Sequence, residues 1–178
     1  MQVFDQLLGI TQCSSFKDKA VPTDVLFDLI KTATAAPHPA DVFPTEFIVV
    51  RDPAKKKLLA EQCPKQSWIE HAPCLIAVCT DYTKIKTLYS DRADLYGKQS
   101  SAVASYALLL QAQESKLAGC WIRAFNDKAV ARIVETKKTP EIILVLGYPK
   151  DKQKQKDDLA AVADVASFEK DGVRLSPF

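Results

Sequence analysis

The chain has 178 residues, 47% of them apolar, and a formal net charge of +2, which suits a single globular domain and gives no strongly basic face for a nucleic acid. It contains only five glycines, at positions 9, 97, 119, 147 and 172, whereas average composition is roughly 7% glycine. Because dinucleotide-binding fingerprints and Walker loops need several glycines close together, these two classes of phosphate-binding fold are excluded.

The first half of the chain predicts three helices and two strands. A short amphipathic helix covers residues 2–9, and Pro22 opens a second helix whose apolar residues recur at three- and four-residue steps. Two prolines, at positions 37 and 39, end that helix and impose an extended loop. The next predicted elements are a strand at 47–50, a helix at 54–62 and a strand at 74–80. The last strand is apolar throughout, so we expect it at the centre of a sheet.

The second half of the chain contains the strongest helical pattern, at residues 99–117. Apolar residues cover almost its whole circumference, which predicts a helix buried either in the domain centre or across a subunit contact. A strand at 120–122, a helix at 127–134 and a strand at 142–146 follow. Because helices and strands are intermixed without regular βα units, the predicted fold class is α+β.

The cysteines and the apolar segments bear on the cellular compartment. Five cysteines without a CxxC pair are typical of buried, reduced thiols in a cytosolic protein. No apolar stretch approaches the roughly 20 residues of a membrane span, and we expect neither a signal peptide nor a membrane partner. His38 and His71 have no cysteine or acidic cluster at a metal-ligand spacing, so no metal site is expected.

Seven segments resemble, in order, the nitroreductase family over about residues 3–150. They are FKDKAVP at 16–22, AAP at 35–37, PTEFIVVRD at 44–52, WIEHAPCLIAV at 68–78, LLLQA at 108–112, LAGCWI at 117–122 and LVLGYP at 144–149. Each segment is only weakly specific, but their common order is hard to obtain by chance.

This resemblance implies an α+β fold with a mixed, largely antiparallel central sheet flanked by helices, and a long buried central helix at a homodimer interface. It implies a single domain over residues 1–178, with a tail at about 151–178 packing on the partner subunit. FMN would lie at the subunit interface and carry a hydride from NADH or NADPH to a small-molecule acceptor, such as a nitro compound or a quinone. The flavin would carry the chemistry, so no catalytic side chain is expected.

The resemblance also assigns positions in this chain to flavin contacts. They are Thr11, Gln12 and Ser14 in the N-terminal segment, His38, Pro39 and Asp41 in the proline-rich loop, Ile122, Arg123 and Ala124 after a strand, and Lys154 after the LVLGYP segment. The contacts at 122–124 are expected from the backbone. His38 is equally compatible with a hydrogen bond to the flavin ring and with a loop histidine that has no role.

The N-terminal segment departs from the family pattern at its charged positions. The family has two arginines there, which the resemblance assigns to the flavin phosphate and ring edge, whereas this chain has no basic residue between Met1 and Lys17. Each lost charge-assisted hydrogen bond is worth on the order of 1.5–3 kcal/mol, unless Arg123 or the lysines after residue 149 compensate. The alternative hypothesis is therefore a divergent dimer that has lost tight FMN binding and acts as a ligand-binding or regulatory module.

Overall fold

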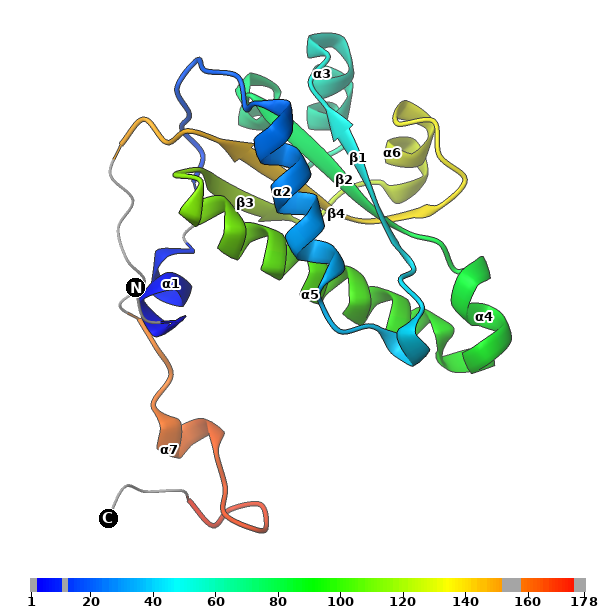
Figure 1. Ribbon diagram of the computed structural model, residues 1–178, viewed down its shortest axis with the longest axis vertical. Coiled ribbons are helices and arrows are strands. Elements are labelled where there is room, and N and C mark those ends of the chain that lie inside the picture. The colour runs from blue at the N-terminus through cyan, green and yellow to red at the C-terminus, as the bar shows by residue number, and fades with distance from the viewer. Residues whose placement is uncertain (1–2, 11–12, 152–157, 175–178) are drawn as a thin grey trace.

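The computed structural model describes residues 3–10, 13–151 and 158–174. A four-stranded sheet lies between two layers of helices (Figure 1). The strands are β1 (Thr45–Val50), β2 (Cys74–Thr80), β3 (Ala118–Ile122) and β4 (Thr139–Gly147). The α-helices are α1 (Val3–Gly9), α2 (Thr23–Thr34), α3 (Pro53–Glu61), α4 (Thr83–Tyr89), α5 (Ala93–Glu114), α6 (Asp127–Ile133) and α7 (Val162–Val165). Short 3₁₀ turns occur at Pro39–Asp41, Ser67–His71 and Ser90–Arg92.

The sheet has the strand order β1-β2-β4-β3, and all three pairings are antiparallel. Every residue of β2 is buried, as its continuous apolar sequence predicts, and β2 lies in the middle of the sheet between β1 and β4. The predicted α+β fold with a largely antiparallel sheet is confirmed. Its expected mixed character is not seen among the described strands.

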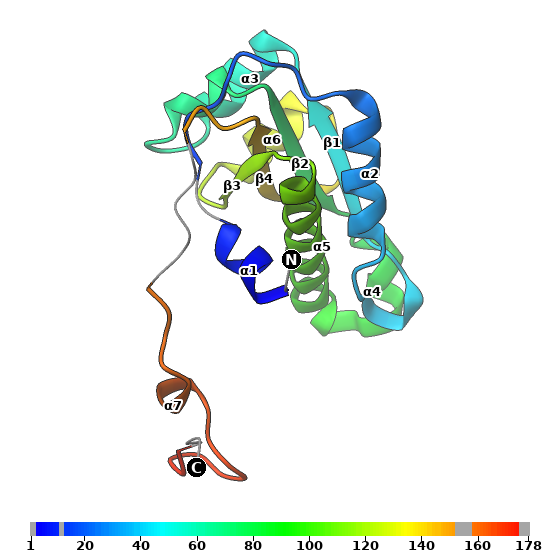
Figure 2. The same ribbon diagram turned by 60° about the vertical axis from the view of Figure 1, so that its left-hand side comes forward.

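Side chains alternate across the sheet and build two cores, one under each helical layer. Leu75, Ala77 and Cys79 face the core beneath α3 and α6, whereas Cys74, Ile76 and Val78 face the core beneath α2 and α5. Figure 2 shows α5 and α2 on one face of the sheet and α3 and α6 on the other. The two cores hold the ends of the strands, and the loops that follow them, in fixed positions.

The central helix differs from its prediction at both ends. The predicted range of 99–117 was wrong, because α5 begins at Ala93 and ends at Glu114. Gly97 lies inside the helix despite its low helical propensity, since an added Cβ would stand 2.6 Å from Cε1 of Tyr82. Lys116, with a left-handed φ of 59°, ends the helix earlier than its apolar pattern suggests.

The remaining elements follow their local sequence signals closely. Asp52 caps α3 by accepting a hydrogen bond from the amide of Lys55 at 2.8 Å, and Asn126 caps α6 in the same way through Ala129 at 3.1 Å. The strands β1, β3 and β4 begin two to three residues before their predicted starts. Helix α4 was not predicted.

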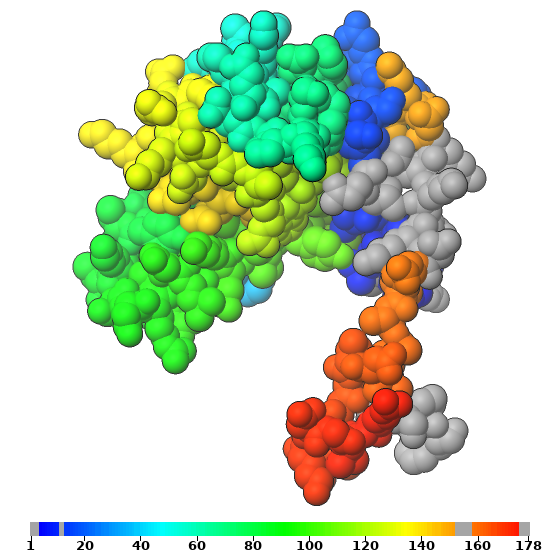
Figure 3. Space-filling view, turned by 180° about the vertical axis from the view of Figure 1, so that it is seen from behind, coloured from blue at the N-terminus to red at the C-terminus, as the bar shows by residue number. Residues whose placement is uncertain are grey.

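Residues 158–174 lie outside the body of the molecule. Figure 3 shows this segment, in orange to red, extending away from the rest of the molecule, and Figure 1 labels α7 within it. Several of its apolar side chains are solvent-exposed, namely Leu159, Val162, Val165, Phe168 and Val173. Among the residues that the structure describes, no helix combines the length and the apolar character needed to cross a membrane.

Candidate functional site

The N-terminal segment is fixed to the chain that leaves β4. The amide of Lys17 donates to the carbonyl oxygen of Tyr148 at 2.7 Å, and the amide of Lys150 donates to that of Ser15 at 3.1 Å. Phe16 and Pro149 form an antiparallel bridge between these two hydrogen bonds. The pairing brings Ser15 and Phe16 next to Pro149 and Lys150, although the two pairs are more than 130 residues apart in the sequence.

A cavity of about 240 Å³, which we call the serine–lysine cavity, lies beside this pairing. It is lined by Ser14, Ser15, Phe16, Trp68, His71 and Lys150. Phe16 and Trp68 stack with 6.4 Å between ring centroids and form its apolar wall. Ser14 is exposed, whereas the expected contacts Thr11, Gln12 and Lys154 lie outside the described residues.

A second cavity, of about 630 Å³, lies beyond the C-terminal end of α2, and we call it the tyrosine cavity. It is lined by Pro37, His38 and Pro39 from the loop after α2, by Tyr89 at the end of α4, and by Tyr96, Gln99, Ser100 and Val103 from α5. Its size and its aromatic and apolar lining, with a few polar groups, are typical of a small-molecule site.

Two expected site residues, His38 and Pro39, line the tyrosine cavity directly. The Nδ1 atom of His38 lies 2.8 Å from the carbonyl oxygen of Ala36, and the imidazole ring packs edge-on against Phe43. Asp41 is exposed, and its φ of 55° follows a φ of 46° at Ala40, so two consecutive residues adopt the left-handed conformation.

The three positions after β3 have different environments. The side chain of Ile122 is buried in the core beneath α6, so only its backbone is available for a ligand. Arg123 and Ala124 are exposed, and the guanidinium carbon of Arg123 lies 5.8 Å from the ring centroid of Trp121. The pairing of β3 with β4 places residue 118 opposite 147 and residue 122 opposite 143, so Arg123 lies at the end of β3 far from the serine–lysine cavity.

Arg123 instead borders a polar cavity of about 660 Å³, whose charged residues are Asp94, Lys98, Arg123, Asp127 and Glu141. In this cavity the hydroxyl of Tyr82 donates to Oε1 of Glu141 at 2.6 Å. Burial, reinforced by the Glu141 carboxylate, raises the pKa of Tyr82 well above its usual range. Tyr82 therefore stays protonated at neutral pH and acts as a fixed donor.

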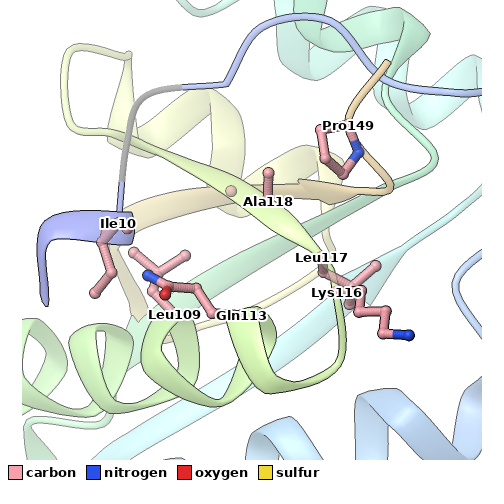
Figure 4. Close-up of a pocket in the computed structure, with 9 residues that line it drawn as sticks. Ile10, Leu109, Gln113, Lys116, Leu117, Ala118 and Pro149 are labelled. Carbon is pink, nitrogen blue, oxygen red and sulfur yellow. The ribbon is translucent and has the colours of Figure 1, made fainter. Parts of the chain in front are cut away.

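A fourth cavity, of about 240 Å³, lies between α1, the end of α5 and the start of β3 (Figure 4). Its lining is mostly apolar, with Ile10, Leu109, Leu117 and Pro149 among its residues, while the side chain of Lys116 points away from the others. We call it the edge cavity, because β3 ends the sheet there and pairs with β4 alone among the described strands.

The thiols contribute no nucleophile to these sites. All five cysteines are buried and carry no disulfide, which confirms the prediction of buried thiols. Burial raises the pKa of Cys63, Cys74 and Cys120 to about 11 and that of Cys79 to about 12. Among the described residues, no three His, Cys, Asp or Glu side chains gather as metal ligands would.

The structure does not bring all the expected contacts together within one chain. Ser14 lies in the serine–lysine cavity, His38 and Pro39 lie at the opposite end of α2, and Arg123 follows the far end of β3 (Figure 1).

The sequence did not point to several residues that line the tyrosine cavity, or to Trp68 in the serine–lysine cavity. Tyr96, Gln99, Ser100 and Val103 recur at three- and four-residue steps along α5, and this spacing could have indicated a common lining. Trp68 was seen only as part of a family segment. Its position in a cavity wall depends on its long-range contact with Phe16, for which no local signal exists.

Comparisons with known proteins agree with this fold over most of the chain. The chain is similar to the FMN reductase (NAD(P)H) of Bacillus subtilis strain 168, with 23% identity over 175 residues that cover 89% of this chain and 70% of the relative. Its fold resembles that of an FMN-dependent nitroreductase from Clostridium difficile R20291, with a TM-score of 0.80, 23% identity and coverage of 94% and 99% of the two chains. It also resembles the NADPH:FMN oxidoreductase from Vibrio harveyi, solved in complex with NAD⁺, with a TM-score of 0.83, 19% identity and coverage of 96% and 79%.

The family model described as the nitroreductase family matches residues 55–148, from α3 through the end of β4. This range is more than half of the chain and contains the central helix, three of the four strands and the loop at 122–124. With a matching family model over this range and a shared fold over nearly the whole length, this chain belongs to the nitroreductase family.

Proposed function

We propose that this protein is an FMN-dependent oxidoreductase that takes reducing equivalents from NADH or NADPH and passes them to an electrophilic small molecule, such as a nitro compound or a quinone. Membership of the nitroreductase family supports the proposal, as do the flavin and nicotinamide names of its relatives. The observation that supports it most is the serine–lysine cavity, because two serines and a lysine line it together beside the N-terminal segment that the family pattern assigns to the flavin phosphate.

The residues present at this cavity fit a phosphate, although the two family arginines are absent. Lys150 supplies a positive charge, and Ser14 and Ser15 supply hydroxyl donors beside it. Phe16 and Trp68 offer an apolar wall for the carbon skeleton next to the phosphate. In this proposal Lys150 takes over the charge of the missing arginines, while Arg123 does not, because it lies at the other end of β3.

The ring system of the flavin would then extend along β3 toward Ile122, Arg123 and Ala124. The Ile122 side chain is fixed in the core, so the backbone of this segment is held rigidly for hydrogen bonds to a ligand. When bound, the flavin supplies the hydride chemistry. The chain would bind it, orient its ring and exclude water from it.

A homodimer completes the proposed site. The outer side of α5 exposes Leu95, Val103 and Tyr106, which is consistent with a subunit contact along this helix. Across such a contact, the loop with His38, Pro39 and Asp41 would approach the flavin held by the partner subunit. This arrangement would explain why the expected flavin contacts lie in separate regions of one folded chain.

The C-terminal tail supplies a second part of the proposed dimer contact. Its exposed apolar side chains, among them Val162, Val165 and Phe168, have no core of their own, and β3, beside the edge cavity, is the last strand of the sheet that the structure describes. We therefore assign the tail of one copy to this region of the other. The reduced thiols fit a cytoplasmic location for the assembly.

An anaerobic reduction experiment tests the proposed reaction. The purified protein, loaded with FMN, should lose its flavin absorbance when NADH or NADPH is added and regain it when a quinone is added. Both steps must be faster than with free FMN under the same conditions. A protein that binds FMN but accelerates neither step would favour the ligand-binding or regulatory alternative.

A further inference from the structure

The polar cavity of about 660 Å³ beside Arg123 has walls from four parts of the chain. The lining comes from the segment after β2, from α5, from the residues after β3 and from the start of β4, namely Tyr82, Asp94, Lys98, Arg123, Phe125, Asp127, Thr139, Pro140 and Glu141. Asp94 and Lys98 lie one turn apart on α5, on the opposite side of that helix from Val103, which lines the tyrosine cavity. The polar cavity is therefore separate from the tyrosine cavity.

Carboxylates give this cavity a negative end around the Tyr82 hydroxyl. That hydroxyl donates to Oε1 of Glu141 at 2.6 Å, and Oε2 of Glu141 has no partner among the described residues. Burial is the main cause that raises the pKa of Tyr82, and the negative charges of Glu141 and Asp94 both add to the shift. An added Cβ at Gly97 would stand 2.6 Å from Cε1 of Tyr82, so close packing against α5 fixes the ring. A cationic group at this fixed hydroxyl would be attracted by both carboxylates.

Two cations give the same cavity a positive end. The guanidinium carbon of Arg123 lies 5.8 Å from the ring centroid of Trp121, and this contact holds the side chain at the end of β3. The family resemblance expects only backbone contacts at this position, so the guanidinium is left for another ligand. Lys98 lines the cavity from α5.

The two sets of charges do not neutralise each other within the cavity. Of the ion pairs found in residues 3–10, 13–151 and 158–174, none involves a residue that lines it. A simple anion would meet the carboxylates, and a simple cation would leave Lys98 and Arg123 unpaired. A ligand that carries both charges matches both ends of the cavity.

We propose that the polar cavity binds a zwitterionic α-amino acid with an apolar side chain, with its ammonium group between Glu141 and Asp94 and its carboxylate at Arg123 and Lys98. An ammonium group has three donors for the carboxylate oxygens, and a guanidinium matches the geometry of a carboxylate. The rings of Tyr82, Phe125 and Pro140 offer apolar surface for the side chain of the ligand. This site is additional to the proposed flavin reaction and does not depend on it.

Calorimetry with three related probes tests which charges the cavity recognises. L-Phenylalanine carries both charges, 3-phenylpropionate lacks the ammonium group, and phenethylamine lacks the carboxylate. Because Lys98 and Arg123 are exposed to solvent, we expect L-phenylalanine to bind with a dissociation constant on the order of 1 mM. Each single-charge probe should bind at least about tenfold more weakly, the loss expected for one charge-assisted hydrogen bond.

Two variants place each charge of the ligand. Glu141→Gln keeps an acceptor for the Tyr82 hydroxyl but removes the negative charge, so it should weaken L-phenylalanine and phenethylamine about tenfold and spare 3-phenylpropionate. Lys98→Met should weaken L-phenylalanine and 3-phenylpropionate and spare phenethylamine. The matched controls are Asp91→Asn and Lys86→Met, which change exposed charges outside the lining and should leave every affinity unchanged.

The titrations are run with and without FMN, so that the outcomes separate this inference from the proposed function. Absence of saturable L-phenylalanine binding up to about 20 mM would overturn the assignment. Equal affinity for the three probes would overturn recognition of a zwitterion, and unchanged affinity in both Glu141→Gln and Lys98→Met would exclude the polar cavity as the site. If the protein binds L-phenylalanine as expected but binds no FMN, the proposed oxidoreductase activity fails while the cavity assignment holds.

Discussion

Ala40 and Asp41 give the loop beside the tyrosine cavity an unusual backbone. Both residues have left-handed φ values, 46° and 55°, which cost a side chain with a Cβ roughly 1 kcal/mol each. The hydrogen bond from the amide of Val42 to the carbonyl oxygen of Pro39, at 3.0 Å, helps to hold this turn. The loop that presents His38 is therefore held in a conformation that its own residues disfavour.

We expect Ala40→Gly to raise the free energy of unfolding by roughly 0.5–1 kcal/mol, because glycine adopts a left-handed φ without steric cost. The matched control is Ala35→Gly, which changes an equally exposed alanine with a φ of −82°. That control should lower the free energy by a similar amount. Urea denaturation at one protein concentration measures both values, and a decrease in both variants would contradict the argument.

Glu46 on β1 accepts hydrogen bonds from Lys138 and, at 3.4 Å, from Lys84. The hydrogen bond from Lys138 is the main cause that holds the pKa of this carboxyl below its usual value, and partial burial opposes the shift. Because the folded state favours the ionised form, this stabilisation is present above the unfolded pKa and is lost as pH falls through the folded pKa.

Glu46→Gln should therefore lower the free energy of unfolding at neutral pH by less than about 1 kcal/mol, and the difference should vanish near pH 3. The control is Glu135→Gln, which removes the ion pair between Glu135 and Lys55. The side chain of Glu135 is 75% exposed. Chemical denaturation of the three proteins at both pH values measures the effect. A difference for Glu46→Gln that persists in acid would show that the ion pairs are not its cause.

At the scale of elements, the end of β4 connects the sheet to the serine–lysine cavity. An added Cβ at Gly147 would stand 2.7 Å from Cδ1 of Phe16 and 2.7 Å from the Pro73 ring. The proline ring cannot rotate away, so Phe16 would have to move. Since Phe16 forms a wall of the cavity and pairs with Pro149, this movement would reach the proposed phosphate site.

We expect Gly147→Ala to lower the free energy of unfolding by roughly 1–3 kcal/mol and to weaken FMN binding. The control is Gly9→Ala at the end of α1, where the three nearest atoms all belong to the flexible Gln113 side chain, which can adjust. Thermal denaturation and flavin fluorescence measure the two effects. If Gly147→Ala lowers the stability but leaves the FMN affinity unchanged, the end of β4 does not determine FMN binding at the serine–lysine cavity.

The sequence predicted most elements because their signals are local. Apolar periodicity and caps located α2, α3, α6 and β2, all within two residues of their observed bounds. The early start of α5 could not be predicted, because glycine disfavours a helix. Only the tertiary contact with Tyr82, which leaves no room for a Cβ at Gly97, accounts for a glycine at this helical position. Helix α4 has no strong apolar face; among its residues only Ile85 is buried.

At the scale of the whole molecule, the proposed homodimer would cover the exposed tail and the exposed side of α5. A chain that keeps several large apolar side chains in solvent gains stability when a partner covers them. Folding and association should then occur together, so stability should depend on protein concentration.

We expect the double variant Val162→Asp, Val165→Asp to weaken the dimer by at least about tenfold, because it places two charges on the apolar side chains of α7. Lys170→Asp is the control, since it adds negative charge to an exposed position of the same tail that is already polar. Analytical ultracentrifugation over a dilution series measures the dissociation constant. An unchanged dissociation constant in the double variant would show that the tail is not part of the dimer contact.

The candidate site was predictable only where the family pattern supplied it. The pattern pointed to Ser14, His38 and Arg123, but the sequence could not show that Lys150 and Ser14 share a cavity or that Arg123 lies at the opposite end of β3. Those relations depend on the antiparallel pairing of β3 with β4 and on the long-range bridge of Phe16 with Pro149. Sheet register of this kind is set by the whole fold, not by neighbouring residues.

We propose that this chain binds FMN through a lysine and hydroxyl groups in place of the missing arginines. Titration of FMN fluorescence with the purified protein tests it most directly. We expect saturable quenching with one FMN per chain, and a loss of affinity of at least about tenfold in Lys150→Ala. Fluorescence that stays proportional to added FMN at protein concentrations of tens of micromolar would contradict it.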